Sequence, residues 1–95
     1  MTRRLGSEKN EVFYRIVQVV NRMLQASQQD GLRKLPEIKD ETDIIGELGI
    51  DSVEMMDLIG LLEKEFSISI DLEHAARKKT VGEIADYLEK LLQET

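Results

Sequence analysis

The sequence predicts an all-α protein: a four-helix bundle with three longer helices, one short third helix and a long loop between helices one and two. Apolar residues recur at helical spacing in three segments. Helix-interrupting residues are sparse, with six glycines and one proline in 95 residues. A chain of this length builds one modest core, so we expect residues 1–95 to form a single domain with a polar tail at 1–6.

The first predicted helix runs from Ser7, its N-cap, to about Gln28. Its apolar positions fall on one broad face. They are Val12, Phe13, Ile16, Val17, Val20, Met23 and Leu24. The next segment, "QQDGLRKLPEIKDETD", loses the periodicity, and we expect Leu32, Leu35 and Ile38 to anchor this long connection to the bundle.

The second helix is expected from Ser52 to about Phe66. Asp51 is its natural N-cap, and Glu54, three residues on, completes a D-x-x-E arrangement akin to the capping box. This assignment leaves Ser52 exposed at the first helical position. The core positions of this helix are Met55, Leu58, Ile59, Leu62 and Phe66.

Two further helices follow. The stretch "DLEHAA" predicts a short helix entered from a brief extended "SISI", and "TVGEIADYLEKLL" predicts the last helix. Thr80 and Glu83 are expected to form its capping box. Its core positions are Val81, Ile84, Leu88, Leu91 and Leu92. Ahead of the second helix, Ile44 and Ile45 are counted with the apolar interior, although the sequence alone defines no pocket.

Composition narrows the classes of function. A net charge of -6 and a pI near 4.8 argue against nucleic acid as a partner, because phosphate binding needs a basic face. Cysteine is absent, which removes disulfides and thiolate zinc sites. No apolar run reaches the roughly 18 residues of a membrane span and no signal peptide is visible, so a cytoplasmic location is expected. His74, the sole histidine, has only scattered carboxylates around it, and we expect neither a metal site nor a catalytic residue.

Ser52 has two interpretations. A serine beside an acid at a helix start usually satisfies free backbone amides, and the local residues alone favour this structural role. Alternatively, its hydroxyl carries a phosphodiester. A helix N-terminus favours an anion there by about 0.3–1 kcal/mol when it is exposed.

The stretch "LGIDSVEMMDLIGLLEKEF" resembles the prosthetic-group site of acyl carrier proteins, in which an L-G-x-D-S-[LV] loop opens an acidic helix. The order and lengths of the later helices agree with that family, so the resemblance implies a bundle of the acyl-carrier type. It also implies that Ser52, beside the motif acid Asp51, receives 4'-phosphopantetheine from coenzyme A through a phosphopantetheinyl transferase. The arm's thiol then holds an acyl group as a thioester, which makes the chain a carrier protein and no enzyme.

The resemblance further implies monomeric action with acyl-transferring and chain-elongating enzymes of fatty acid, lipid or polyketide synthesis. Basic docking patches on these enzymes meet the acidic second helix, and the acyl chain enters between the helices as cargo. The positions implied in partner contact are Glu47, Val53, Glu54, Met56, Asp57 and Glu63. Glu65 adds charge to this helix.

Several features depart from the family pattern. Gly60 stands where the family often has a larger apolar residue, which either opens space or permits a tight helix contact. Lys64 interrupts the acidic run, and "ARKK" at 76–79 is basic. With a longer tail and first loop, these departures indicate a specialised bacterial member whose pathway the sequence does not name.

Other classes of protein are alternatives to an acyl carrier. Peptidyl and D-alanyl carriers share the architecture and the arm, and the sequence separates them poorly from acyl carriers. A helical adaptor would use the same acidic face with Ser52 unmodified. A serine hydrolase is disfavoured, because no G-x-S-x-G occurs and His74 has no evident acid partner for a triad.

Overall fold

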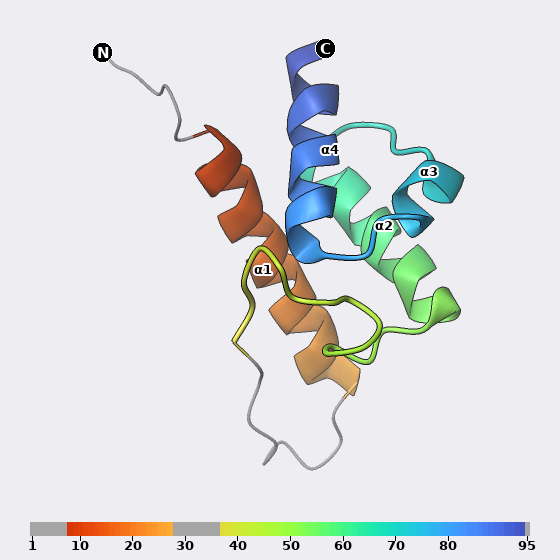
Figure 1. Cartoon of the computed structure of the whole chain (residues 1–95). Helices are drawn as coiled ribbons and strands as arrows, with labels where there is room; N and C mark the ends of the chain where they lie inside the picture. The colour runs from red at the N-terminus through yellow and green to blue at the C-terminus, as the bar shows by residue number, and fades with distance from the viewer. Residues whose placement is uncertain (1–7, 28–36, 95) are drawn as a thin grey trace.

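A computed structural model describes residues 8–27 and 37–94 of the chain. Within these ranges the chain forms four helices, which confirms the predicted all-α bundle with one short third helix (Figure 1). They are α1 (Glu8–Ser27), α2 (Ser52–Phe66), α3 (Leu72–Ala76) and α4 (Val81–Glu94). The predicted polar tail, the cap at Ser7 and the anchors Leu32 and Leu35 lie outside the described residues.

The helix α1 packs against both α4 and α2, and α3 packs against α2 (Figure 1). The three longer helices therefore share one core, to which the loop before α2 also contributes. The largest fully buried side chains are Ile16, Val19, Val20, Ile44, Ile50, Leu58, Leu62, Val81, Ile84 and Leu88. Burying each such side chain contributes about 1.5–3 kcal/mol, so the core is the main source of stability. Within the described ranges, none of the helices combines the length and apolar character that crossing a membrane requires.

Two apolar positions differ from the predicted pattern. Val17 is only half-buried, whereas Val19, which was not placed on the apolar face, is buried. The cause is that α1 contacts two helices, so its buried face is wider than one stripe. In the loop, Ile44 is buried but Ile45 is 66% exposed, because successive residues of the turn face opposite sides. The predicted anchor Ile38 does pack against the core.

The start of α2 is closed by its own residues. Asp51 is the N-cap, and its Oδ1 accepts a hydrogen bond of 2.8 Å from the amide of Glu54. Glu54 Oε1 accepts in return from the amide of Asp51 at 3.2 Å. The predicted capping box and both predicted ends of this helix are thus confirmed.

The far end of α2 is held by α1. Arg15 Nε lies 3.0 Å from Glu65 Oε2, and Arg15 Nη2 donates to the backbone oxygen of Glu65 at 2.7 Å. The same guanidinium stands over the ring of Phe66, 4.3 Å from its centroid. The helix then ends at Ser67, which adopts the left-handed conformation with φ 55°.

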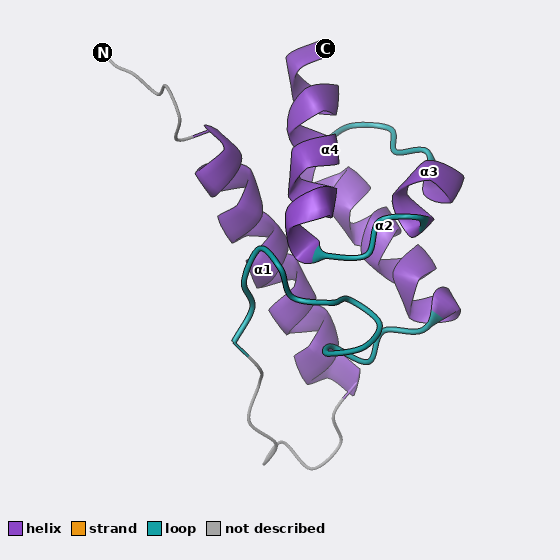
Figure 2. Cartoon of the chain, viewed as in Figure 1, coloured by secondary structure: helices purple, strands orange, loops and turns teal. Residues whose placement is uncertain are grey.

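The loop before α2 is tied to the connection between α3 and α4, and Figure 2 shows the two segments running together ahead of the bundle. The amide of Ile44 donates to the oxygen of Lys79 at 2.9 Å, and the amide of Val81 donates to the oxygen of Thr42 at 3.1 Å. These two bonds join residues 42–44 and 79–81 in a short antiparallel pairing. We call this pairing the strap.

Gly82 extends the strap into the first turn of α4. Its amide donates to the oxygen of Asp40 at 2.8 Å. A Cβ at this position would also lie 2.8 Å from the same oxygen, which is too close for any side chain. Only glycine therefore allows the loop to lie directly on the start of α4.

The capping box predicted for α4 forms only in part. Thr80 Oγ1 accepts from the amide of Glu83 at 3.1 Å, as expected. The carboxylate of Glu83, however, accepts from the amide of Lys79 at 2.8 Å rather than from Thr80, so the reciprocal half of the prediction is wrong. The strap fixes the backbone here, since Thr80 lies opposite Asp43.

Candidate functional site

Ser52 is the first residue of α2 and is exposed. The structural role considered for it, satisfying the first-turn amides, is performed by Asp51, whose side chain accepts from Glu54. By helix geometry, the amides of Ser52 and Val53 have no acceptor within the helix. The hydroxyl therefore stands at the positive end of a helix that does not need it as a cap.

A tight turn places this serine. Asp43 Oδ1 accepts from the amides of Ile45 and Gly46, each at 3.1 Å, and the amide of Gly49 donates to the oxygen of Ile45 at 3.1 Å. Gly49 has φ +70°, a conformation that favours glycine. The chain then drives Ile50 into the core, directly before the cap. The position of Ser52 is thus fixed on both sides.

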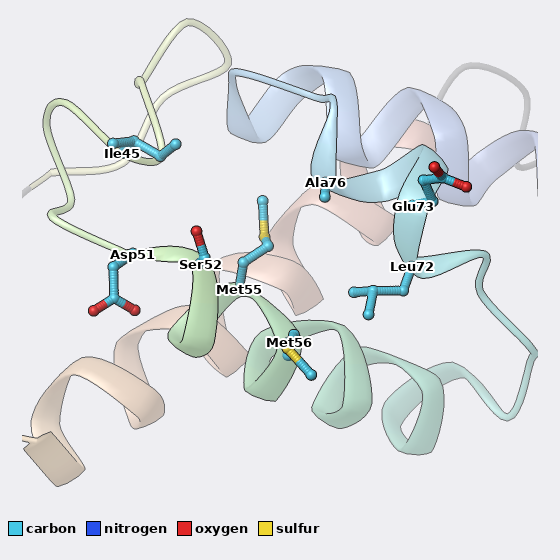
Figure 3. A pocket seen from close by; sticks show the side chains of 8 residues that line it. All are labelled: Ile45, Asp51, Ser52, Met55, Met56, Leu72, Glu73 and Ala76. Atoms are coloured by element: carbon cyan, nitrogen blue, oxygen red, sulfur yellow. The ribbon is translucent and has the colours of Figure 1, made fainter.

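A pocket of about 370 Å³ opens beside Ser52, between the turn, the start of α2 and α3. Its lining residues are Ile45, Asp51, Ser52, Met55, Met56, Leu72, Glu73 and Ala76. In Figure 3 Met55 and Leu72 point into the space between α2 and α3, while Asp51 and Glu73 point away from it. The pocket is therefore apolar inside, with the serine at its edge.

Exposed apolar side chains gather around the same serine. Ile45, Val53 and Met56 are 66%, 68% and 56% exposed, and Leu72 is also exposed. Isolated exposed apolar residues are ordinary, but a group of them at one place indicates a binding surface. Val53 and Met56, both predicted as partner contacts, are thus accessible to another molecule.

The predicted acidic contacts near Ser52 differ in whether their carboxylates are exposed and whether they already accept hydrogen bonds. Asp57 is exposed on α2. Glu54 is half-buried and its carboxylate belongs to the capping box, while Glu47 Oε1 accepts from the amide of Asp43 at 3.2 Å. Asp57 is consequently the more available charge of the three.

The carboxylates farther along α2 point toward other parts of the chain. Glu63, a predicted partner contact, is half-buried and accepts from the amide of Ile70 at 2.8 Å. Glu65 faces α1, where Arg15 binds it and Arg22 Nη2 lies 3.6 Å from its Oε1. The helix therefore presents fewer acids to a partner than its sequence contains.

His74 takes part in a cluster between α3 and α4. Its ring lies 4.5 Å from the ring of Tyr87, and the ammonium of Lys78 lies 5.7 Å from that ring. The hydroxyl of Tyr87 accepts from the amide of Asp71, the N-cap of α3, at 3.3 Å. These contacts hold α3 beside α4. No group of three or more metal-ligating side chains comes together in residues 8–27 and 37–94.

The sequence predicts Asp51, Ser52 and Met56 as site residues, but not the other residues that line the pocket. It places Ile45 with the apolar interior, and Leu72, Glu73 and Ala76 only in or beside a short helix. The one available signal was Leu72, an apolar residue on a helix too short to bury much surface. The turn and α3 meet only in the folded chain, so spacing could not reveal the pocket.

Comparison with known proteins assigns a class to this arrangement. Residues 15–88 match the family model described as phosphopantetheine attachment site. An exposed serine at a helix start beside an apolar pocket suits such a group, because the helix N-terminus favours its phosphate and the pocket can cover an extended arm. The molecule is thus a carrier of a covalently attached 4'-phosphopantetheine rather than an enzyme.

Relatives named acyl carrier protein match most of the chain. The one from Bdellovibrio bacteriovorus is 42% identical over 53 residues, covering 56% of this chain and 68% of the relative. The one from Thermotoga maritima is 27% identical over 86 residues, covering 90% and 98%. The one from Amoebophilus asiaticus is 40% identical over 58 residues, covering 61% and 72%. The chain belongs to the acyl carrier protein family, and its role is that of an acyl carrier.

Proposed function

We propose that Ser52 is the residue to which the 4'-phosphopantetheine is attached. The observation that carries this assignment is that Ser52 is exposed at the start of α2 while Asp51 and Glu54 perform the capping. These two residues also fix the backbone of the first turn, on which Ser52 is presented. The motif "LGIDSVE" provides independent support.

The attachment exchanges the phosphoanhydride bond of coenzyme A for a phosphate ester bond to the serine. A phosphopantetheinyl transferase directs Ser52 Oγ onto the phosphorus that carries the pantetheine in coenzyme A. The new Oγ–P bond forms as the pyrophosphate P–O bond breaks, adenosine 3',5'-bisphosphate leaves, and the hydroxyl proton passes to a base. The phosphodiester then remains beside the free first-turn amides of α2, where its negative charge is favourable.

The pocket beside Ser52 accommodates the arm and the start of its cargo. The group supplies a terminal thiol that holds the acyl chain as a thioester. Met56 and Leu72, both exposed lining residues, would contact the apolar parts of the arm, and Met55, buried and unbranched, would adapt to cargo of different shape. The carrier itself performs no bond-making step.

Partner enzymes recognise the surface around Ser52. We assign Val53 and Met56 as apolar contacts and Asp57 as the main charged contact, with Glu47, Glu54 and Glu63 contributing to the field. Basic patches on acyl-transferring and chain-elongating enzymes of fatty acid, lipid or polyketide synthesis complement this surface. The contacts are weak, fast and sensitive to salt, as a monomeric cytoplasmic shuttle requires.

The nearest alternatives are a peptidyl or D-alanyl carrier and an adaptor without a covalent group. Relatives named acyl carrier protein favour acyl cargo over the first two. The adaptor differs in its chemistry, because it needs no modification of Ser52. One mass measurement separates it from every carrier.

The protein is incubated with coenzyme A, magnesium and a broad-specificity phosphopantetheinyl transferase, and its intact mass is measured. We expect the wild type and Ser69→Ala to gain one phosphopantetheinyl group and Ser52→Ala to gain none. Ser69 is a matched control, since it is an exposed serine outside any helix. A gain in Ser52→Ala would move the site elsewhere. No gain in folded wild type with any transferase tested would favour the adaptor.

A further inference from the structure

A second hollow lies along α2, on the side of α1. It is an open groove of about 600 Å³ between the C-terminal half of α1 and the middle of α2. Its lining includes Arg22, Met23, Ala26, Gly60, Leu61 and Lys64. Met56 lines both this groove and the pocket beside Ser52, so the two hollows lie next to each other on α2.

Gly60 forms a notch in the groove. Among residues 8–27 and 37–94, a Cβ built at Gly60 meets no atom within 4 Å, although the residue is half-buried. The explanation that Gly60 permits a tight helix contact is therefore wrong, and the alternative, that it opens space, is correct. A glycine inside a helix weakens it, and no contact in the described part of the chain offsets that loss. The open space at Gly60 is part of the groove.

The groove has a charge at each end. Asp57 and Lys64 stand three residues before and four residues after Gly60, which puts all three on one face of α2. Neither Asp57 nor Lys64 forms an ion pair within residues 8–27 and 37–94. Arg22 adds positive charge beside Lys64, since its 3.6 Å pair with Glu65 is exposed and weakly held.

We propose that this groove docks a helix of a partner enzyme that carries a base, a bulky apolar residue and an acid along one face. The apolar side chain fills the notch over Gly60, the base pairs with Asp57, and the acid pairs with Lys64 and Arg22. The proposal deepens the carrier function, on which it rests for the partner being an enzyme that acts on the carried group.

The charge order also excludes partners. A wholly basic docking helix would place a like charge against Lys64 and Arg22, which disfavours it. The groove thus selects enzymes whose docking surface has both signs. A single helix in such a groove buries little area, so the contact remains weak enough for exchange between enzymes.

The test uses three synthetic alanine-rich helical peptides with the spacing of Asp57, Gly60 and Lys64. The mixed peptide carries Lys, Phe and Glu, and the other two carry Lys, Phe, Lys or Glu, Phe, Glu. Each is titrated into the full isotope-labelled chain and followed by NMR at physiological salt. We expect the mixed peptide to shift the amides around Gly60 and to bind about fivefold more tightly than either single-sign peptide.

Two substitutions of Gly60 distinguish the effect of filling the notch from the effect of changing helix stability. Gly60→Leu fills the space and should weaken binding of the mixed peptide by about tenfold, while circular dichroism shows an intact helix. Gly60→Ala restores helix propensity but leaves most of the notch, so its binding should stay within about twofold of wild type. Lys64→Glu should reverse the preference toward the wholly basic peptide.

Defined results overturn the proposal. Equal binding of the mixed and basic peptides would contradict selection by charge. Undiminished binding of the mixed peptide to Gly60→Leu would contradict a role for the space over Gly60. If the Gly60→Leu substitution shifts the amide signals of residues 28–36 when no peptide is present, that segment of the chain occupies the groove. If wild type self-associates and Gly60→Leu does not, a second copy occupies it.

The mass measurement on Ser52 keeps this proposal distinct from the carrier assignment. Normal attachment at Ser52 without peptide preference would overturn the groove alone. Peptide preference without attachment would overturn the carrier site and leave the groove standing. The Ser52→Ala variant should bind the mixed peptide as wild type does, because the serine lies outside the groove.

Discussion

The N-terminal end of α2 is closed by its own residues, whereas its C-terminal end depends on another helix. At the start, Asp51 and Glu54 bind each other's amides, and no distant residue of the described part of the chain takes part in this cap. At the end, Arg15 from α1 binds Glu65 and covers Phe66. The same helix therefore has one end held by its own residues and one end at which contacts from α1 add to the local cap at Ser67.

This difference between the two ends of α2 places the attachment residue at one end and a contribution to core stability at the other. Ser52 lies at the self-contained end, so a large group attached there disturbs no packing between helices. The other end is buried and contributes to the core. Substitutions at the two ends should consequently have opposite profiles, with loss of stability at one and loss of attachment at the other.

Phe66→Ala tests the dependent end and should have the largest effect on stability. Phe66 is 7% exposed, and its removal leaves a cavity below Arg15. We expect a loss of about 3–4 kcal/mol in the free energy of unfolding, measured by urea denaturation. Tyr14→Ala is the matched control, because Tyr14 is 61% exposed and its loss should change stability by less than about 0.5 kcal/mol. Similar losses in both variants would contradict the comparison.

Asp51→Ala tests the self-contained end. It removes the acceptor for the amide of Glu54 and should lower the free energy of unfolding by about 1 kcal/mol. Asp51→Asn should recover most of this loss, since asparagine caps nearly as well. An equal loss in both variants would show that the charge of Asp51, rather than its capping oxygen, stabilises the helix.

Arg15→Met tests how much of the stabilisation at the C-terminal end of α2 is electrostatic. Methionine keeps an apolar stem but removes the bonds to Glu65. The two side chains are 41% and 29% exposed, so solvent screening limits the expected loss to about 0.5 kcal/mol. Urea denaturation with 1 M sodium chloride should reduce the difference from wild type. A difference that salt does not change would assign the effect to packing on Phe66.

Ser52→Ala should have the smallest effect on stability. It is therefore the sharpest test of the difference between the attachment residue and the residues that stabilise α2. Because Asp51 does the capping, we expect a change of only a few tenths of a kcal/mol in the free energy of unfolding. Thermal unfolding followed by circular dichroism provides the measurement. A loss near that of Asp51→Ala would mean that the serine shares the structural role.

The local end of α2 was also the part of the fold that the sequence predicted best. Asp51, Glu54 and the helical spacing that follows are short-range signals, and both ends of α2 were correct. The failures involve tertiary neighbours. Val19 is buried because α1 has two partners, and Glu83 binds Lys79 because the strap fixes the backbone before α4.

The candidate site was predictable to the same extent. Ser52 followed from a motif of consecutive residues, and its exposure followed from the cap. The pocket and the groove did not, because each requires segments far apart in the chain to meet. Gly60 was recognised as unusual, yet only the arrangement of α1 beside α2 shows which of its two explanations holds.

The strap makes the two walls of the pocket beside Ser52 differ in how they are held. Its bonds fix residues 40–44 and 79–82 against each other, so the turn that forms one wall of the pocket cannot retreat. The opposite wall, α3, has five residues and lies between the end of α2 and the strap. Side-chain contacts hold this wall instead, because the ring of His74 packs on Tyr87 and the hydroxyl of Tyr87 accepts from the amide of Asp71. One wall of the pocket is therefore fixed by backbone hydrogen bonds between two loops, and the other by contacts to a single aromatic side chain of α4.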